Sequence, residues 1–357
     1  MVLQGEFDDD SELVRTLAYD KTVVAPAAYL EKVVAGITDA VVEAYEKRTA
    51  ARGAAGFGLA ESVAFNRRFR MASGYSMTHP GVGNPDILEP AGPTDPQVGV
   101  VGAWNAEGQL LGCIVNFACH ATTGPGGISA DYVHYIERTI RGTMGDQAIV
   151  VFVAGNAGDI TQVDNRTPFQ ITQFGERAAR LLGGTVGAEA LKTLLALEVT
   201  ASSDLSVAAL SRRLEIARRP PRPERVEAAL ALVARDPADV DATEWTFAKE
   251  IVLLDARIRR EPSAQVEVQA IQIGPAVLLA CPAEYFVQHG LDMKDGSPFP
   301  VTLPVSLAND CVGYVPTEEA FSPRGGGYET RLTSYSNLIP SAGRTIADTL
   351  IEMLPNS

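Results

Sequence analysis

Three apolar segments of strand length run directly into side chains that a packing role does not require. Histidine, aspartate and glutamate are among them, and these side chains carry protons or ligate metals in protein sites. In open α/β sheets, binding sites gather where strands end and loops begin. We therefore treat the three strand ends as one candidate site. Its members are His120 after 113–119, Asn156, Asp159 and Thr161 after 149–153, and Glu284 after 276–281.

Three of these residues also have a structural interpretation, and the sequence leaves both readings open. His120 could be a hydrogen-bonded histidine at the end of a strand. Glu284 could be a carboxylate at a helix N-terminus, because residues 285–289 could open a helix. Asp159 follows a Gly-Asn-Ala-Gly turn and could cap or close that turn.

The elements that must position these residues alternate between strand and helix patterns. Apolar residues at helical spacing span 30–45, and two hairpins are expected, at 98–104 with 110–119 and at 266–273 with 276–281. Residues 148–153 form a strand that is apolar on both faces, as in buried parallel strands. The pattern predicts one α/β layered domain over residues 1–357, with a large mixed sheet flanked by helices.

Other segments fill in this organisation. A charged section at about 211–262 is expected to be a helical excursion from the domain, because both of its flanks return to strand patterns. Residues 72–97 are rich in glycine and proline and predict a long ordered loop. The first 25 residues are acidic and weakly patterned. Further helices are expected at 132–143, 174–194 and 224–235, around 247–258, and around 346–351.

Composition narrows the class of protein. The 357 residues carry 30 Lys+Arg and 44 Asp+Glu, a net charge of −14, which disfavours a nucleic-acid binder. No run of about 18 apolar residues predicts a membrane span, and no secretory signal is visible. Cys113 and Cys119 lie in one apolar run and are expected to be buried free thiols. These features predict a cytoplasmic protein, or a secreted one if the true N-terminus lies upstream.

Eight short stretches, in order along the chain, resemble segments of the neutral/alkaline (non-lysosomal) ceramidases and their bacterial relatives. The resemblance is collinear over roughly residues 29 to 352. The stretches are Phe65-Asn-Arg67, Asn84-Pro-Asp86 through Gly99, Asn116-Phe-Ala-Cys-His120-Ala-Thr122, Ser129-Ala-Asp131-Tyr132, Gly158-Asp159-Ile-Thr161, Pro282-Ala-Glu284, Gly313-Tyr314-Val-Pro316-Thr317 and Gly327-Tyr328-Glu329.

The resemblance implies a zinc-dependent amidohydrolase that cleaves the amide of an N-acylated sphingoid base. It implies that His120, Glu284 and Tyr314 ligate zinc, and that Arg67 and Tyr328 hold or polarise the substrate. Zinc with N and O ligands lowers the pKa of a bound water toward about 7, which suits attack on an amide carbonyl.

Four further positions have expected roles. The family usually carries a serine in its Gly-Asp-x-Ser segment, which contributes to the active site. Here that position is Thr161, which keeps the hydroxyl and adds a methyl group. The residues expected to support the site are Asp131, Asn156 and Asp159.

The sequence also departs from the family. Relatives carry an early His-Thr-His-Ser-Gly-like segment with zinc-binding and catalytic histidines, and nothing like it precedes Tyr29. His79 follows the helix that begins near Tyr29 instead of preceding it, so we do not assign it to the site. Three explanations stay open: a chain that starts late, a partner chain that supplies the segment, or a relative with little metal. The further C-terminal β-sandwich domain of the classical ceramidases is also not expected here.

Two other functions therefore remain as alternatives. One is a catalytically incomplete relative that acts as a binding or scaffold subunit. The other is a hydrolase of a different N-acyl substrate on the same scaffold. The expected partners are a small-molecule or lipid amide and, in the shared-site case, a partner chain or a second copy.

Overall fold

The computed structural model describes residues 2–3, 5–168 and 173–355. Its helices are α1 (Glu12–Tyr19), α2 (Ala27–Glu46), α3 (Val133–Met144), α4 (Glu176–Leu197), α5 (Pro223–Val233), α6 (Ala242–Arg260), α7 (Val287–Asp295) and α8 (Ala342–Glu352). Short 3-10 helices are η1 (Glu198–Thr200), η2 (Pro237–Asp239), η3 (Glu318–Phe321) and η4 (Tyr328–Thr330).

The strands follow the same chain order. They are β1 (Val2–Leu3), β2 (Val24–Ala25), β3 (Arg52–Leu59), β4 (Phe65–Asn66), β5 (Arg68–Met71), β6 (Ser76–Thr78), β7 (Ile87–Pro90), β8 (Gln97–Trp104), β9 (Leu110–Phe117), β10 (Ile149–Ala154), β11 (Ile160–Thr161), β12 (Val207–Ala217), β13 (Ser263–Ile273), β14 (Ala276–Ala280), β15 (Glu284–Tyr285), β16 (Val301–Val305) and β17 (Tyr314–Val315).

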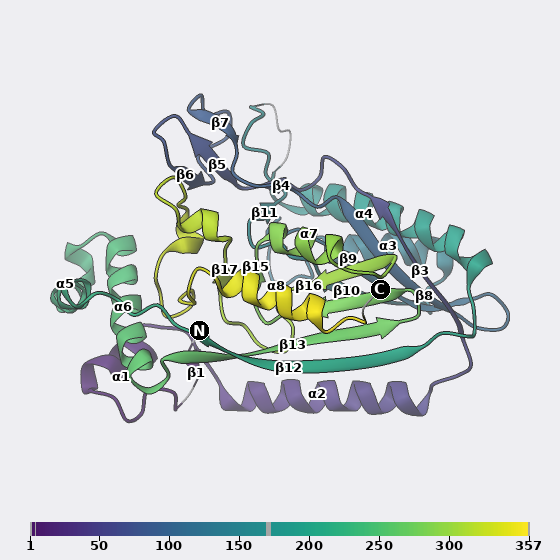
Figure 1. Cartoon of the computed structure of the whole chain (residues 1–357), viewed down its shortest axis with the longest axis horizontal. Helices are drawn as coiled ribbons and strands as arrows, with labels where there is room; N and C mark the ends of the chain where they lie inside the picture. The colour runs from purple at the N-terminus through teal and green to yellow at the C-terminus, as the bar shows by residue number, and fades with distance from the viewer. Residues whose placement is uncertain (1, 4, 169–172, 356–357) are drawn as a thin grey trace. The chain divides into compact units, whose positions relative to one another are not determined.

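The predicted α/β class is confirmed, but the strands are not collected in one large sheet. Among the described residues there are two four-stranded sheets, in the orders β10-β9-β8-β3 and β12-β13-β14-β16 (Figure 1). Both are mixed, since β10 runs parallel to β9 and β14 runs parallel to β16, whereas the other registered pairs are antiparallel. Smaller sheets pair β5 with β6 and β7, β4 with β11, and β15 with β17.

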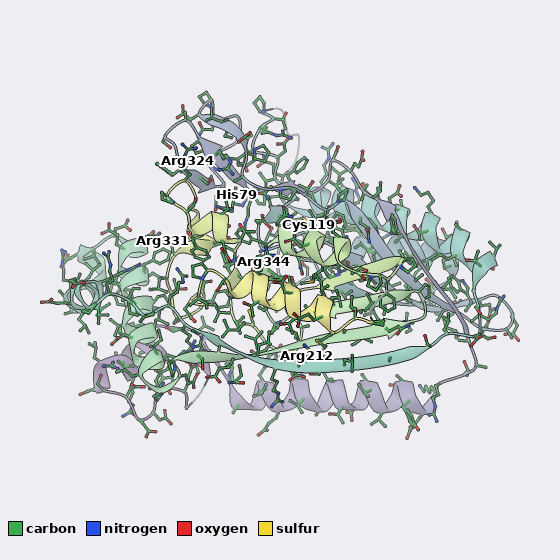
Figure 2. The ribbon with its side chains drawn as sticks, viewed as in Figure 1. His79, Cys119, Arg212, Arg324, Arg331 and Arg344 are labelled. Atoms are coloured by element: carbon green, nitrogen blue, oxygen red, sulfur yellow. The ribbon has the colours of Figure 1, made fainter. Side chains whose placement is uncertain are left out.

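The chain divides into two compact units. The smaller unit contains residues 1–50, 217–264 and 332–337, and the larger unit contains the remaining residues. The larger unit contains the strand ends of the candidate site. Its helices α7 and α8 pack together, and α7 contacts β16. Arg212 lies on β12 (Figure 2). It pairs with Glu352 of α8 at 3.6 Å. Whether the chain acts as the single domain expected from the sequence stays a prediction.

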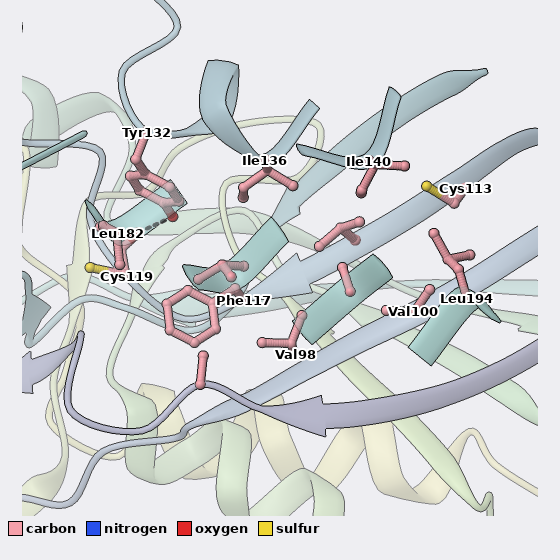
Figure 3. Close-up of a cluster of buried hydrophobic side chains, with 14 of the residues drawn as sticks. Val98, Val100, Cys113, Phe117, Cys119, Tyr132, Ile136, Ile140, Leu182 and Leu194 are labelled. Carbon is pink, nitrogen blue, oxygen red and sulfur yellow. Dashed lines mark hydrogen bonds between the residues drawn. The ribbon is translucent and has the colours of Figure 1, made fainter. Parts of the chain in front are cut away.

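One face of the first sheet forms the main hydrophobic core with α3 and α4. Val98, Val100, Phe117, Ile136 and Leu182 belong to this cluster of buried side chains (Figure 3). The opposite face meets the second sheet through a smaller apolar cluster that joins β8 to β14 and β16. Each sheet thus buries apolar side chains on its faces, which fixes the strand ends that carry the polar residues.

The strand β10 differs from its prediction. Its sequence is apolar on both faces, yet Ile149 is 65% exposed and Val151 is 47% exposed. The strand lies at the edge of its sheet and pairs only with β9 among the described strands. Hydrophobicity alone therefore did not show that this strand is at an edge.

Both predicted hairpins form, β8 with β9 and β13 with β14. The section at 211–262 is not wholly helical, because it opens with the end of β12 before α5 and α6. The expected loop at 72–97 contains the short strands β6 and β7. Cys113 and Cys119 are buried free thiols, as expected.

The smaller unit has its own core, where α1, α5 and α6 bury Val14, Leu17, Ile251 and Leu254 together with Phe7. Helix α1 falls within the acidic, weakly patterned N-terminal stretch. Ser11 caps its first turn, because its hydroxyl accepts from Val14 N–H. In contrast, no residue of α2 is buried, although its apolar residues recur at helical spacing and mark one face. In the part of the chain that the structure describes, we find no helix with the length and apolar character for crossing a bilayer.

The close packing of α4 on the start of α3 gives a stability prediction. A Cβ added at Gly183 would lie 2.0 Å from the backbone oxygen of Tyr132. Gly183→Ala should therefore force the two elements apart and lower the free energy of unfolding by about 1–3 kcal/mol. Urea denaturation followed by circular dichroism measures this loss.

The neighbouring glycine provides the matched control. A Cβ at Gly184 would meet nothing within 4 Å. Gly184→Ala should raise stability by up to about 1 kcal/mol, because alanine favours the helical state more than glycine does. Equal effects of the two substitutions would contradict this packing description.

Candidate active site

His120 lies directly beyond β9, and its imidazole is fixed by β11. Its Nδ1 lies 2.9 Å from the backbone oxygen of Ile160, and its backbone N–H donates to the same oxygen at 3.2 Å. A carbonyl oxygen only accepts hydrogen bonds, so Nδ1 carries the ring proton. The other ring nitrogen, Nε2, is thereby directed toward Glu284, with 3.0 Å between Nε2 and Oε2.

Glu284 and Tyr314 are brought together by the register of two short strands. Strand β15 pairs in parallel with β17, with Glu284 opposite Tyr314. The Tyr314 hydroxyl lies 3.5 Å from His120 Nε2. The three residues that the resemblance assigned to zinc therefore meet around one imidazole nitrogen, although they lie far apart in the sequence.

Tyr328 and Arg67 complete this cluster. The Tyr328 hydroxyl lies 3.4 Å from the Tyr314 hydroxyl. The guanidinium carbon of Arg67 lies 5.4 Å from the centre of the Tyr314 ring and 5.1 Å from that of Tyr328. A cation at this range is attracted to the ring faces, so Arg67 is held against both tyrosines.

A buried ion pair positions Arg67, and no role for its acidic partner was expected from the sequence. Arg67 Nε donates to Glu329 Oε1 at 3.0 Å, and the side chains are 5% and 0% exposed. Arg67 Nη2 donates to the Gly158 oxygen at 2.7 Å, and Thr78 Oγ1 donates to Glu329 Oε2 at 2.6 Å. Glu329 lies within the quoted Gly-Tyr-Glu stretch, but its pairing with a residue 262 positions away has no local signal.

Burial and neighbouring charges shift the pKa values of Arg67, Tyr314 and Tyr328. Burial disfavours the charged form of Arg67, but Glu329 and the two tyrosines outweigh it and leave the pKa of Arg67 raised. Burial raises the pKa of both Tyr314 and Tyr328, with Arg67 opposing the rise. Both phenols are therefore hydrogen-bond donors near neutral pH.

The pairing of His120 with Glu284 indicates a place for a positive charge. With the ring proton on Nδ1, an unprotonated Nε2 would face a carboxylate oxygen as acceptor against acceptor. The arrangement is favourable only when a proton or a bound cation is shared between the two atoms. A histidine that donates its other nitrogen to a backbone carbonyl is also the usual geometry of a metal ligand.

The donor set fits zinc through one imidazole, one carboxylate and one tyrosine. Nitrogen and oxygen donors of this kind are those that zinc takes, and catalytic sites often use three protein ligands. Across residues 2–3, 5–168 and 173–355, no group of three or more His, Cys, Asp and Glu side chains is placed to hold a metal. Tyr314 would therefore be the third donor.

Thr161 follows Ile160 in β11, the strand that contacts the His120 imidazole. It pairs with Phe65 across β11 and β4, and its hydroxyl donates to Gln162 Oε1 at 3.1 Å. Gln162 also donates to the backbone oxygens of Thr122 and Gln173, so it ties the segment after His120 to β11. The Thr161 hydroxyl thus contacts an amide that supports the local structure.

The three residues expected to support the site make structural contacts. Asp159 accepts from Val287 N, in the first turn of α7, at 2.9 Å and from Asn66 at 2.8 Å, and burial raises its pKa. Asp131 accepts from Thr123 Oγ1 at 2.7 Å and from two backbone N–H groups. Asn156 accepts from Ser306 at 2.9 Å. The cap of α7 is thus supplied by Asp159, whereas Glu284 lies in a strand before that helix.

Comparison with solved structures places this geometry in a known fold. The crystal structure of neutral ceramidase from Pseudomonas aeruginosa matches 91% of this chain with a TM-score of 0.62 and 20% sequence identity. The chain's fold is similar to that of neutral ceramidase. A structure of ceramidase complexed with C2 matches 86% of the chain with a TM-score of 0.57 and 19% identity.

The similarity to ceramidase covers only part of those proteins. The chain spans 56% of the first structure and 54% of the second, about half of each. No family model matches the sequence, and no curated protein matches it. The similarity of fold that the motifs predicted is therefore confirmed.

Proposed function

We propose that the chain is a zinc-dependent amidohydrolase of N-acyl compounds, with an N-acyl sphingoid base as the nominal substrate. The observation that carries the proposal is the 3.0 Å approach of His120 Nε2 to Glu284 Oε2, beside the Tyr314 hydroxyl. The fold similarity to neutral ceramidase supports the same reaction class.

Each residue of the site has a task in this reaction. His120, Glu284 and Tyr314 would hold the zinc, which when bound supplies a Lewis acid at the amide carbonyl. Arg67 is cationic and preorganised by Glu329, so it is suited to stabilise negative charge that develops on the carbonyl oxygen. Tyr328 keeps its hydroxyl proton and is suited to donate to the same oxygen.

A hollow beside the site supports an acyl substrate. It has a volume of about 560 Å³ and is lined by Ala121, the residue after His120, and by residues 124–131. This loop consists mainly of small side chains, and its apolar Ile128 is fully exposed. A surface of this kind offers an acyl chain space and apolar contact.

A substrate panel tests the proposal. Zinc-supplemented protein is incubated with N-acyl amino acids, simple N-acyl amines and ceramides, and the released fatty acid and amine are both quantified by mass spectrometry. We expect equal amounts of acid and amine from at least one member, with loss after chelation. Release from non-sphingoid members alone would replace the nominal substrate. No release from any member would contradict the proposal and favour a binding or scaffold subunit.

A further inference from the structure

Strands β15 and β17 carry two of the three proposed zinc donors, although each strand has only two residues. Their parallel pairing places Glu284 opposite Tyr314. Glu284 N donates to the Gly313 oxygen at 2.9 Å. Phe286 N donates to the Val315 oxygen at 3.3 Å. A pair of strands this short is at best marginally stable by itself. Contacts from other elements must therefore hold the register that brings the two side chains together.

The imidazole of His289, in the first turn of α7, contacts both segments. The ring stacks on Tyr285, the residue next to Glu284, with 4.6 Å between the ring centres and 17° between the ring planes. Its Nε2 lies 3.4 Å from the oxygen of Pro316, which directly follows β17. A carbonyl oxygen only accepts hydrogen bonds, so Nε2 carries the ring proton and donates it. One side chain thus joins the strand of Glu284 to the end of the strand of Tyr314.

Neighbouring groups enclose this ring, and His289 is only 6% exposed. A Cβ added at Gly343, in the first turn of α8, would lie 2.2 Å from His289 Nε2. The absence of a side chain there lets the backbone of α8 close against the ring. The Tyr285 hydroxyl donates to the oxygen of the same Gly343. Helices α7 and α8 pack together (Figure 1). The imidazole therefore has little freedom to leave its place between the two segments.

The imidazole of His289 is neutral near pH 7. Burial lowers its pKa below the ordinary value. The Pro316 oxygen opposes this shift, as do three nearby carboxylates, those of Asp292, Glu318 and Asp348. A neutral ring has one N–H, and the contact with Pro316 places it on Nε2. The ring thus supplies a hydrogen-bond donor and a packing surface without adding a charge behind the site.

We propose that His289 is a positioning residue of the candidate zinc site. By holding the oxygen of Pro316 beside Tyr285, its imidazole fixes the separation of β15 and β17. That separation sets the distance between the Glu284 carboxylate and the Tyr314 hydroxyl. Groups that orient metal ligands in this way contribute to metal affinity. The inference rests on the proposed function, because it concerns the zinc donors of the same site.

Two amide variants of different reach test this role. His289→Gln keeps an N–H donor near the place of Nε2, whereas His289→Asn is one methylene group shorter and places the same donor nearer to Nδ1. His134→Gln, at an exposed position on α3, is the control. Circular dichroism checks that each protein is folded. Each protein then competes for zinc with a chelator of known affinity, which gives its Kd for zinc.

We expect His289→Asn to raise the Kd for zinc by about 10-fold or more. His289→Gln should recover most of this loss, and His134→Gln should match wild type. The loss should also depend on Tyr314. In a Tyr314→Phe background, which lacks the hydroxyl, His289→Asn should raise the Kd much less, because the donor that it misplaces is already absent.

Gly343→Ala tests the same contact without changing the histidine. Its added Cβ would displace the imidazole from Pro316, so this variant should also raise the Kd for zinc. It provides an independent measurement if His289→Asn does not fold. Wild-type zinc affinity in folded Gly343→Ala protein would show that the contact is not needed and would overturn the inference.

The outcomes distinguish the two levels of the proposal. If wild-type protein binds no zinc, the proposed function fails and the role of His289 fails with it. If wild-type protein binds zinc and His289→Asn binds it equally well, the inference about His289 alone is overturned. Equal losses in His289→Asn and His289→Gln, or an undiminished loss in the Tyr314→Phe background, would also overturn it, since either result indicates a general structural role.

Discussion

Glu329→Ala is expected to lower the free energy of unfolding by about 3–5 kcal/mol, because it leaves the buried charge of Arg67 without its partner. Both members of this ion pair are almost fully buried, at 5% and 0% exposure. The substitution also removes the acceptor of the Thr78 hydroxyl. Urea denaturation of wild type and variant measures the difference.

Two matched variants control this result. Glu329→Gln keeps the size and one oxygen acceptor, so its loss should be smaller, about 1–3 kcal/mol. Replacing both partners, as Arg67→Met with Glu329→Leu, should cost less than Glu329→Ala alone, because no charge is then left buried. A Glu329→Ala variant within about 0.5 kcal/mol of wild type would show that the pair is not buried as described.

His120→Ala is expected to reduce amide turnover by more than about 10³-fold. This is a larger loss of rate than removal of one hydrogen-bond donor to an oxyanion usually causes. The substitution removes the imidazole that contacts Glu284 at 3.0 Å, and it also removes a neighbour of the Tyr314 hydroxyl. Initial rates of acid release at saturating substrate measure the loss.

His134→Ala serves as the control for that experiment. His134 is exposed on α3, and its ring contact is with Tyr135. Its rate should match wild type. A His120→Ala variant that keeps more than a tenth of the wild-type rate would contradict the assignment of His120.

Local patterns predicted the parts of the fold that depend on neighbouring residues. The hairpin of β8 and β9 followed from a turn at Asn105 and Gly108 between two apolar runs. Edge position is different, because it depends on what pairs with a strand. For that reason β10, though apolar throughout, was predicted as buried but lies at a sheet edge.

Helix packing shows the same limit. The spacing of apolar residues predicted α2 correctly as a helix. The same residues mark one apolar face of the helix, yet no residue of α2 is buried. Periodicity identifies the side of a helix that is suited to packing, but it does not identify the element that covers it.

The site was predictable only where motifs marked it. Strand ends and motif spelling singled out His120 and Glu284, but their approach depends on register between strands far apart in the sequence. No role was predicted for Glu329, because the evidence for it is three-dimensional. An ion pair between residues 262 positions apart leaves no periodic trace in the sequence.

The central claim is that His120 and Glu284 share a bound metal ion, and elemental analysis of purified protein tests it most directly. Wild-type protein, His120→Ala, Glu284→Gln and the His134→Ala control are equilibrated with zinc, desalted and measured by mass spectrometry for metal content. We predict stoichiometric zinc in wild type and in the His134→Ala control, and a large loss in the other two variants. Wild-type protein without zinc, or equal zinc in all four proteins, would contradict the claim.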